Sequence, residues 1–197
     1  MYYSKLNDII KLNNKKFLFK EVIKNIEKHE VLKFDNNKLL NILKSACRNT
    51  IIPVNNIEYI GRPNEFGNIV ANLFAVECRK LKLKYQKPKD SQGKKKESGY
   101  PDGFLEFMDK YYYYIELKTC EEKQQDKTLR TFFYSPSTNS KIIYDASHLL
   151  ICFLTVKNGN ILQLNGNYCI VDLHEKEVKL KLEYNSNNKE LYGGHLL

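Results

Sequence analysis

Hydrophobic and polar residues alternate along two neighbouring stretches in the middle of the chain, 102–107 and 112–118. Alternation with a period of two predicts a β-strand with one buried face. The apolar residues of both stretches fall on a single face: Leu105, Phe107, Tyr113, Ile115 and Leu117. Residues 108–110 interrupt the pattern and predict a turn, so the two stretches are expected to form a hairpin with one apolar and one polar face.

The alternation also selects a register for this hairpin, with Asp102 opposite Glu116 and Phe104 opposite Tyr114. Paired residues point to the same side of a sheet, and a slip of one residue would place apolar side chains against polar ones. The carboxylates of Asp102 and Glu116 are therefore expected to converge, with Lys118 two residues further along. A surface hairpin whose acidic side chains are merely solvated is the alternative.

Two carboxylates held close together repel each other, and one pKa rises unless a divalent cation lies between them. Ligation by oxygen atoms alone suits Mg²⁺, which takes one or two carboxylates together with substrate phosphate. The hairpin therefore predicts a Mg²⁺ site at Asp102 and Glu116.

The rest of the chain predicts helices before the hairpin and mainly strands after it. Apolar residues recur at helical spacing in 17–26 and 39–47, separated by the polar break 35–37, so residues 1–60 are expected to be mostly helical. A connection broken by prolines, from Ile51 to Pro63, is expected next. Asn64 is a good N-cap for a further helix that ends near residue 80.

This last helix carries two acidic residues of interest, Glu65 and Glu77. An acid in the first turn is favoured by the helix dipole alone, so Glu65 is either such a residue or a third carboxylate of the metal site. Glu77 is a weaker substitute for Glu65 in that site and is expected to be exposed.

Further strands are expected at 81–86, 148–156, 161–164, 168–173 and 178–184, with a hairpin turn at Asn158–Gly159. Strand 148–156 is apolar throughout, as expected of a strand covered on both faces. His148 at its start is expected to be a structural histidine. The pattern predicts a single α/β domain over residues 1–197, with a helical accessory layer (1–60), a core (64–156) and C-terminal strands (157–197).

The composition of the chain indicates a polyanionic binding partner. The chain has 32 Lys and Arg residues against 23 Asp and Glu, with a pI near 9.1. Residues 87–98 contain five lysines and no large apolar residue, which predicts a mobile basic loop that contacts phosphates or is merely solvated. The candidate DNA-binding residues lie in this loop and in 129–141: Lys94, Lys95, Lys96, Arg130, Thr131, Tyr134, Ser135, Asn139 and Lys141.

Other classes of site have little support in the sequence. The five cysteines are scattered without a CxxC motif, which argues against a zinc site and for reduced, structural thiols. No apolar run reaches the roughly 18 residues that a membrane span needs. The first residues do not resemble a targeting segment, and a cytoplasmic protein is expected.

The spacing of the polar residues resembles that of a known family. Pro101–Asp102, thirteen intervening residues (103–115) and then Glu116–Leu117–Lys118 are similar to the motif of the PD-(D/E)xK nucleases. The resemblance implies a restriction-endonuclease-like core with a central mixed β-sheet flanked by helices. It also implies that Asp102, Glu116 and the Leu117 carbonyl bind Mg²⁺, that Lys118 orients the attacking water, and that Glu65 joins the site.

Within this superfamily the chain most resembles a compact type II restriction endonuclease. Thr119 and Cys120 follow Lys118, where some exonucleases and resolvases have Gln or a second Lys. The resemblance implies cleavage of double-stranded DNA at a specific short sequence, a homodimer, and a cognate DNA methyltransferase as counterpart. A structure-selective nuclease, of the junction-resolvase or repair type, and a non-catalytic DNA-binding protein remain the alternatives.

Overall fold

The computed structural model describes residues 10–96, 98–124 and 132–182. The chain divides into two compact units, one formed by residues 19–176 and a smaller one formed by residues 1–18 and 177–197. In the smaller unit, β1 (Lys16–Leu18) pairs antiparallel with β8 (Glu177–Lys179). A single domain over residues 1–197 stays a prediction.

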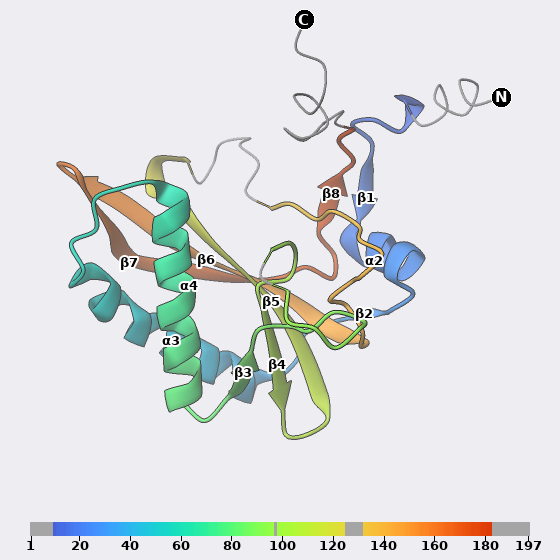
Figure 1. The fold of residues 1–197 in the computed structure, drawn as a ribbon, viewed down its shortest axis with the longest axis horizontal. Coiled ribbons are helices and arrows are strands. Elements are labelled where there is room, and N and C mark those ends of the chain that lie inside the picture. Colours follow the sequence, from blue (N-terminus) through green and yellow to red (C-terminus); the bar gives the residue numbers. More distant parts are fainter. Residues whose placement is uncertain (1–9, 97, 125–131, 183–197) are drawn as a thin grey trace, which may run out of the picture. The chain divides into compact units, whose positions relative to one another are not determined.

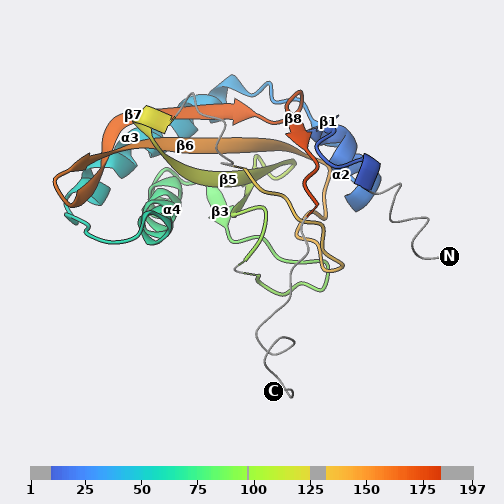
Figure 2. The same cartoon turned by 90° about the horizontal axis from the view of Figure 1, so that it is seen from above.

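The larger unit is built on a six-stranded mixed sheet. Its strands are β2 (Val31–Leu32), β3 (Lys84–Gln86), β4 (Gly103–Phe107), β5 (Tyr111–Glu121), β6 (Ala146–Asn158) and β7 (Ile161–Asp172). Five of them follow the order β2-β6-β5-β4-β3, and β7 also pairs with β6. β6 runs parallel to β2 and β5, whereas the pairs β3–β4, β4–β5 and β6–β7 are antiparallel. Figure 2 shows β7, β6 and β5 as successive ribbons of the twisted sheet.

Three α-helices flank this sheet: α2 (Phe19–Glu27), α3 (Asn37–Asn55) and α4 (Pro63–Lys80). α3 and α4 pack against each other and against the apolar face of the sheet (Figure 1). The predicted apolar face of the hairpin is part of this core, and Leu105 and Ile115 are completely buried in it. The central mixed sheet flanked by helices, as expected of a restriction-endonuclease-like core, is therefore confirmed.

The helix boundaries correct two predictions. α3 begins after Asn36, whose side chain accepts a hydrogen bond from the Leu39 amide at 2.9 Å, and it continues through Pro53 instead of breaking there. The missing N–H of Pro53 removes one helical hydrogen bond close to the C-terminal end, where the loss is easily accommodated. α4 begins at Pro63 with Arg62 as its N-cap, because proline suits the first helical position, where its missing N–H would be unpaired anyway.

Two further predictions change in detail. Residues 10–60 contain the short strands β1 and β2 besides α2 and α3, so this layer is not purely helical. The segments 161–164 and 168–173 form one strand, β7, with an irregularity opposite Phe153–Thr155. Gly166 lies there at a φ of 94°, a conformation that glycine adopts without strain. None of the described helices is both long and apolar enough to cross a membrane.

Candidate active site

The β4–β5 hairpin has the register that its sequence predicts. Phe104 pairs with Tyr114 and Leu105 pairs with Tyr113. The turn at 108–110 places Met108 and Asp109 in the left-handed region. Because residues two apart along a strand point to the same face, the polar face of β5 carries these side chains: Tyr112, Tyr114, Glu116 and Lys118.

Asp102 lies one residue before β4 and is attached to the facing strand. Its Oδ2 atom accepts a hydrogen bond from the Leu117 backbone N–H at 2.9 Å. If the register of β4 and β5 is continued, Pro101 lies opposite Leu117. In an antiparallel sheet, a residue at such a position normally donates its N–H to the facing carbonyl and accepts a hydrogen bond from the facing N–H. Because Pro101 has no N–H, it cannot donate a ladder hydrogen bond to the Leu117 carbonyl. The end of this ladder thus brings the Asp102 carboxylate close to a carbonyl oxygen for which Pro101 provides no donor.

Glu116 is the most perturbed carboxylate of the site. Only 3% of the residue is exposed. Burial, and after it the negative charge of Asp102, raise the pKa of Glu116 to about 7, against the opposing positive charges of Lys118 and Lys141. Its Oε1 atom lies 2.5 Å from the Lys118 ammonium. Its Oε2 atom is buried without a hydrogen-bond partner among the described residues.

Such an oxygen normally has a partner, because an unpaired buried polar atom is costly. Asp102 and Glu116, the carboxylate pair from here on, therefore have the chemistry of a cation site: oxygen donors, mutual repulsion and one unused buried oxygen. A hard divalent cation such as Mg²⁺ fits this donor set.

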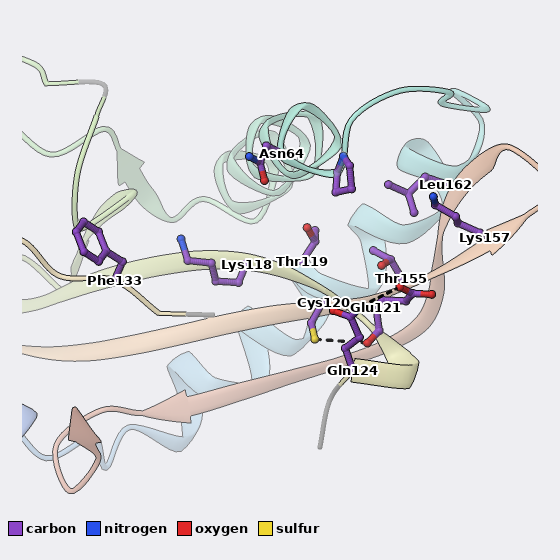
Figure 3. Close-up of a pocket in the computed structure, with 11 residues that line it drawn as sticks. Asn64, Lys118, Thr119, Cys120, Glu121, Gln124, Phe133, Thr155, Lys157 and Leu162 are labelled. Atoms are coloured by element: carbon purple, nitrogen blue, oxygen red, sulfur yellow. Dashed lines mark hydrogen bonds between the residues drawn. The ribbon is translucent and has the colours of Figure 1, made fainter. Parts of the chain in front are cut away.

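Lys118 connects the carboxylate pair to open space. Its side chain is 29% exposed and takes part in lining a cavity of about 620 Å³ between the start of α4 and the C-terminal part of β5. Figure 3 shows Lys118 extending from β5 towards α4, with Asn64 on the α4 side. The cavity is lined by Pro63, Asn64, Lys118, Thr119, Cys120, Glu121, Gln124, Phe133, Thr155, Lys157 and Leu162. An ammonium group thus lies between a buried carboxylate and a space open to a ligand.

Glu65 has a hydrogen-bond partner outside the carboxylate pair, and its role as a third carboxylate of the site stays a prediction. Glu65 is exposed in the first turn of α4, and its Oε2 atom accepts a hydrogen bond from the Tyr59 hydroxyl at 2.7 Å. This contact depends on Gly61, where a Cβ atom would lie 2.3 Å from the Tyr59 oxygen. Among the described residues, no group of three His, Cys, Asp or Glu side chains is arranged to hold a metal ion.

Glu77 corrects a prediction, because it is buried and not exposed. Only 5% of the residue is accessible, and its Oε1 atom forms an ion pair with the Lys80 ammonium at 2.7 Å. A lysine three residues further along the helix can reach back over this position. The helical spacing of residues in this segment could not show that Glu77 would be buried beside Lys80.

The lysine-rich segment 87–98, the lysine loop, is held by hydrogen bonds in its described part instead of extending freely. Asp90 Oδ1 accepts hydrogen bonds from the backbone amides of Gln92 and Lys94, both at 2.9 Å. The Ser91 amide donates to the Ser140 carbonyl at 2.9 Å. An aspartate that closes a turn in this way orders the backbone locally. The lysine count could not show this, because the ordering depends on Asp90 and on residues some 50 positions away.

These contacts place two sets of candidate DNA-binding residues side by side. The Lys96 ammonium donates to Ser137 Oγ at 3.0 Å, and the Gln92 side chain lies 3.5 Å from Asn139 Oδ1. Lys94 and Lys95 remain exposed on the lysine loop. A joint surface formed by 89–96 and 135–140 therefore combines exposed ammonium groups with neutral hydrogen-bonding side chains.

The other candidate DNA-binding residues are placed differently. Ser135 is exposed. Tyr134 packs edge-on against Phe19 and Tyr100, and its hydroxyl donates to the Glu27 carboxylate. Burial, and after it the contact with Glu27, raise the pKa of Tyr134. Arg130 and Thr131 lie outside the described residues.

Lys141 is the residue that sequence reasoning placed least well. It was expected at the DNA surface, but only 3% of it is exposed, and its ammonium donates to two backbone carbonyls. No local signal distinguishes it from the surface lysines, because its burial depends on the fold around it.

His148 stays predicted as a structural histidine; its Nε2 atom is buried without a hydrogen-bond partner among the described residues. It is completely buried, and its Nδ1 atom lies 2.7 Å from the Tyr100 hydroxyl. Burial lowers the pKa of His148 to about 3, so the ring is neutral near pH 7. The five cysteines are free thiols, as expected.

Comparison with known proteins gives two matches. A sequence model of the type II restriction enzyme MjaV family matches residues 10–195. The chain is also 30% identical over 222 aligned positions to the type II restriction enzyme MjaV of Methanocaldococcus jannaschii. That alignment covers 100% of this chain and 95% of the relative. The similarity therefore extends over both the helices and the sheet that carry the site.

Proposed function

Because the chain belongs to the type II restriction enzyme MjaV family, we propose that it hydrolyses duplex DNA at a specific short sequence, with Asp102, Glu116 and Lys118 as its active site. The observation that carries the assignment is the carboxylate pair, in which buried Glu116 has one unpaired oxygen and holds the Lys118 ammonium with the other. This arrangement is the one expected of a PD-(D/E)xK nuclease, and it supports our proposal that the chain belongs to that superfamily.

Mg²⁺ is the cofactor that the donor set favours. The carboxylate pair and the Leu117 carbonyl would hold it, since all three supply oxygen ligands. A bound Mg²⁺ would polarise the scissile phosphate and increase the acidity of the attacking water. Glu116 has to be ionised for this role, and the positive charges of Lys118 and Lys141 both favour its ionised form.

Lys118 provides the protein's own cation at the reacting phosphate. Its ammonium is held by Glu116 and borders the cavity, so it can orient a water molecule and stabilise negative charge that develops on the phosphate oxygens. Phosphoryl transfer depends mainly on positioning and charge stabilisation, and little covalent participation by the protein is needed. We expect products with 5′-phosphate and 3′-hydroxyl ends.

The surface formed by the lysine loop and residues 135–140 is proposed to bind the DNA backbone. Changing both Lys94 and Lys95 to alanine should weaken DNA binding by roughly tenfold at low salt. The slope of log K against log salt concentration should fall by about 1–2, because each phosphate contact contributes about one unit. Fluorescence anisotropy in Ca²⁺ would measure the affinity and its salt dependence, with Lys38→Ala, at an exposed position of α3, as the control. An unchanged salt slope would exclude this surface.

Other properties of the family complete the proposal. Type II restriction enzymes commonly act as homodimers on palindromic sites, opposite a DNA methyltransferase that protects the same sequence, and we propose both for this chain together with a cytoplasmic location. Sedimentation of the purified protein with and without DNA would test the dimer.

The decisive experiment is incubation of the purified protein with long duplex DNA and Mg²⁺, followed by sequencing of the ends. Discrete fragments that share one terminal sequence are expected. Selective cutting of branched or damaged substrates would instead indicate a structure-selective nuclease. Salt-dependent retention on DNA without any Mg²⁺-dependent product would indicate a non-catalytic DNA-binding protein.

A further inference from the structure

Lys141 lies close behind the proposed active site, in the segment that leads into β6. Only 3% of the residue is exposed, so its ammonium is shielded from a DNA phosphate at the surface. A lysine is rarely this buried unless its charge is paired or its donors are satisfied. The Lys141 ammonium is therefore expected to have hydrogen-bond acceptors inside the protein.

The Lys141 ammonium holds the backbone that enters the hairpin. Its Nζ atom donates to the Gly99 carbonyl at 2.6 Å and to the Pro101 carbonyl at 2.8 Å. Pro101 directly precedes Asp102, so these two hydrogen bonds fix the chain at the last peptide before the catalytic carboxylate. The Pro101 carbonyl would otherwise face the position of Leu117, whose N–H is bound by Asp102 instead.

The same ammonium acts on both members of the carboxylate pair. Burial lowers the pKa of Lys141, whereas the negative charges of Asp102 and Glu116 raise it. In return, the Lys141 charge lowers the pKa of Glu116. The ammonium is therefore a fixed positive charge close to two carboxylates that repel each other.

The backbone around Lys141 is anchored to the strand that carries Glu116. The Tyr114 hydroxyl accepts hydrogen bonds from the amides of Ile143 at 2.8 Å and Tyr144 at 3.2 Å. Tyr114 is fully buried, and it lies on the same face of β5 as Glu116, two residues earlier. Lys141 thus links β5, through Tyr114, to the backbone that positions Asp102.

We propose that Lys141 is a positioning residue of the active site, whose ammonium holds the backbone from Gly99 to Pro101 so that the Asp102 carboxylate stays beside Glu116. This inference rests on the proposed nuclease function. Without the ammonium, the buried Pro101 carbonyl and the less buried Gly99 carbonyl lose their donor, and the carboxylate pair loses a neighbouring positive charge. The Asp102 carboxylate then shifts, although the DNA-binding surface is unchanged.

The Lys141→Met variant, which keeps an unbranched side chain only one atom shorter but removes the charge, tests this role. We expect kcat to fall about 100-fold, because small misplacements in an active site have effects of this size. KM and the Kd for DNA in Ca²⁺ should stay within about threefold of wild type, since no phosphate contact is lost. Rates are normalised to the folded fraction, and Lys38→Met serves as the control.

Two results of this comparison would overturn the inference. A raised KM with unchanged kcat would make Lys141 a phosphate contact, and unchanged kinetics would show that its ammonium is dispensable. If the wild-type protein itself fails to cleave DNA in Mg²⁺, the proposed function fails. If the wild type cleaves DNA and Lys141→Met cleaves it equally well, the inference about Lys141 is wrong but the proposed function stands.

Chemical labelling of the wild-type protein keeps the inference testable if the variant does not fold. Brief acetylation followed by mass spectrometry should modify Lys94 and Lys95 in the free protein and less so when DNA is bound. Lys141 should remain unmodified in both states, because its ammonium is buried and bonded. Labelling of Lys141 in the free protein, with protection by DNA, would contradict the inference.

Discussion

Replacing Lys118 with alanine is expected to lower the rate of DNA cleavage by about 10²–10³-fold, the usual cost of removing one group that stabilises developing charge. Asp102→Ala should reduce cleavage at least as strongly, because it removes half of the carboxylate pair. DNA binding in Ca²⁺ should remain within about threefold of wild type for Lys118→Ala, since the proposed DNA-binding surface is untouched. Single-turnover cleavage and anisotropy measure the two quantities separately.

The expectation for Lys118 comes from its position between a buried anion and open space. Its ammonium lies 2.5 Å from Glu116 Oε1 and borders the cavity of about 620 Å³. Lys110→Ala, at the exposed turn of the same hairpin, is the matched control and should cleave normally. Undiminished cleavage by Lys118→Ala or by Asp102→Ala would refute the assignment of the active site.

The hairpin could be predicted from the sequence because its two strands and its turn are determined by residues that are close together in the chain. Alternation of side chains fixes the faces of β4 and β5, and burial of one face fixes their register, so that Asp102 and Glu116 converge. The nuclease resemblance rests on the same few positions. The apolar run that forms most of β6 is an equally local pattern.

The parts that escaped prediction depend on contacts between distant segments. Lys141 is buried because Tyr114 holds the following amides and because the backbone at Gly99 and Pro101 accepts its hydrogen bonds. The lysine loop is ordered because Asp90 closes a turn next to Ser140. In both cases, charged residues that are indistinguishable in sequence receive different roles from the tertiary fold.

The role of Glu65 also depends on contacts that the local sequence pattern does not contain. Its position in the first turn of α4 is compatible both with a metal site and with simple stabilisation by the helix dipole. In the structure its carboxylate accepts a hydrogen bond from the Tyr59 hydroxyl, which lies close to Gly61. A helical pattern carries no information about such a contact.

The metal-free protein is expected to become more stable when Glu116 is replaced by glutamine. A carboxylate whose folded-state pKa is about 7, against an ordinary value of 4.5, binds more protons in the folded than in the unfolded state between these pH values. Stability therefore falls as pH rises from about 4.5 to 7, and the loss is complete above that window. At pH 8 the cost of ionised Glu116 is about 3 kcal/mol, an upper value for what Glu116→Gln can recover.

Thermal unfolding in EDTA at pH 8 and pH 5 measures this effect. Glu116→Gln should raise Tm by several degrees at pH 8, since about 1 kcal/mol corresponds to a shift of about 2–4 °C in a chain of this size. The difference should nearly vanish at pH 5, where most of Glu116 is protonated. Glu106→Gln is the control, because Glu106 lies on the same hairpin in a partly exposed ion pair with Lys84 and should change stability little at either pH.

In Mg²⁺ the wild type is expected to be more stable than Glu116→Gln, the reverse of their order in EDTA. A ligand that binds only the folded state stabilises it in proportion to the logarithm of its concentration over Kd, so wild type should gain stability with Mg²⁺ while Glu116→Gln gains much less. The variant should also lose cleavage, which separates its gain in stability from any gain in function. If Glu116→Gln were less stable than wild type at pH 8 in EDTA, the Glu116 carboxylate would be adequately paired without a cation. The main physical argument for a metal site at Asp102 and Glu116 would then be lost.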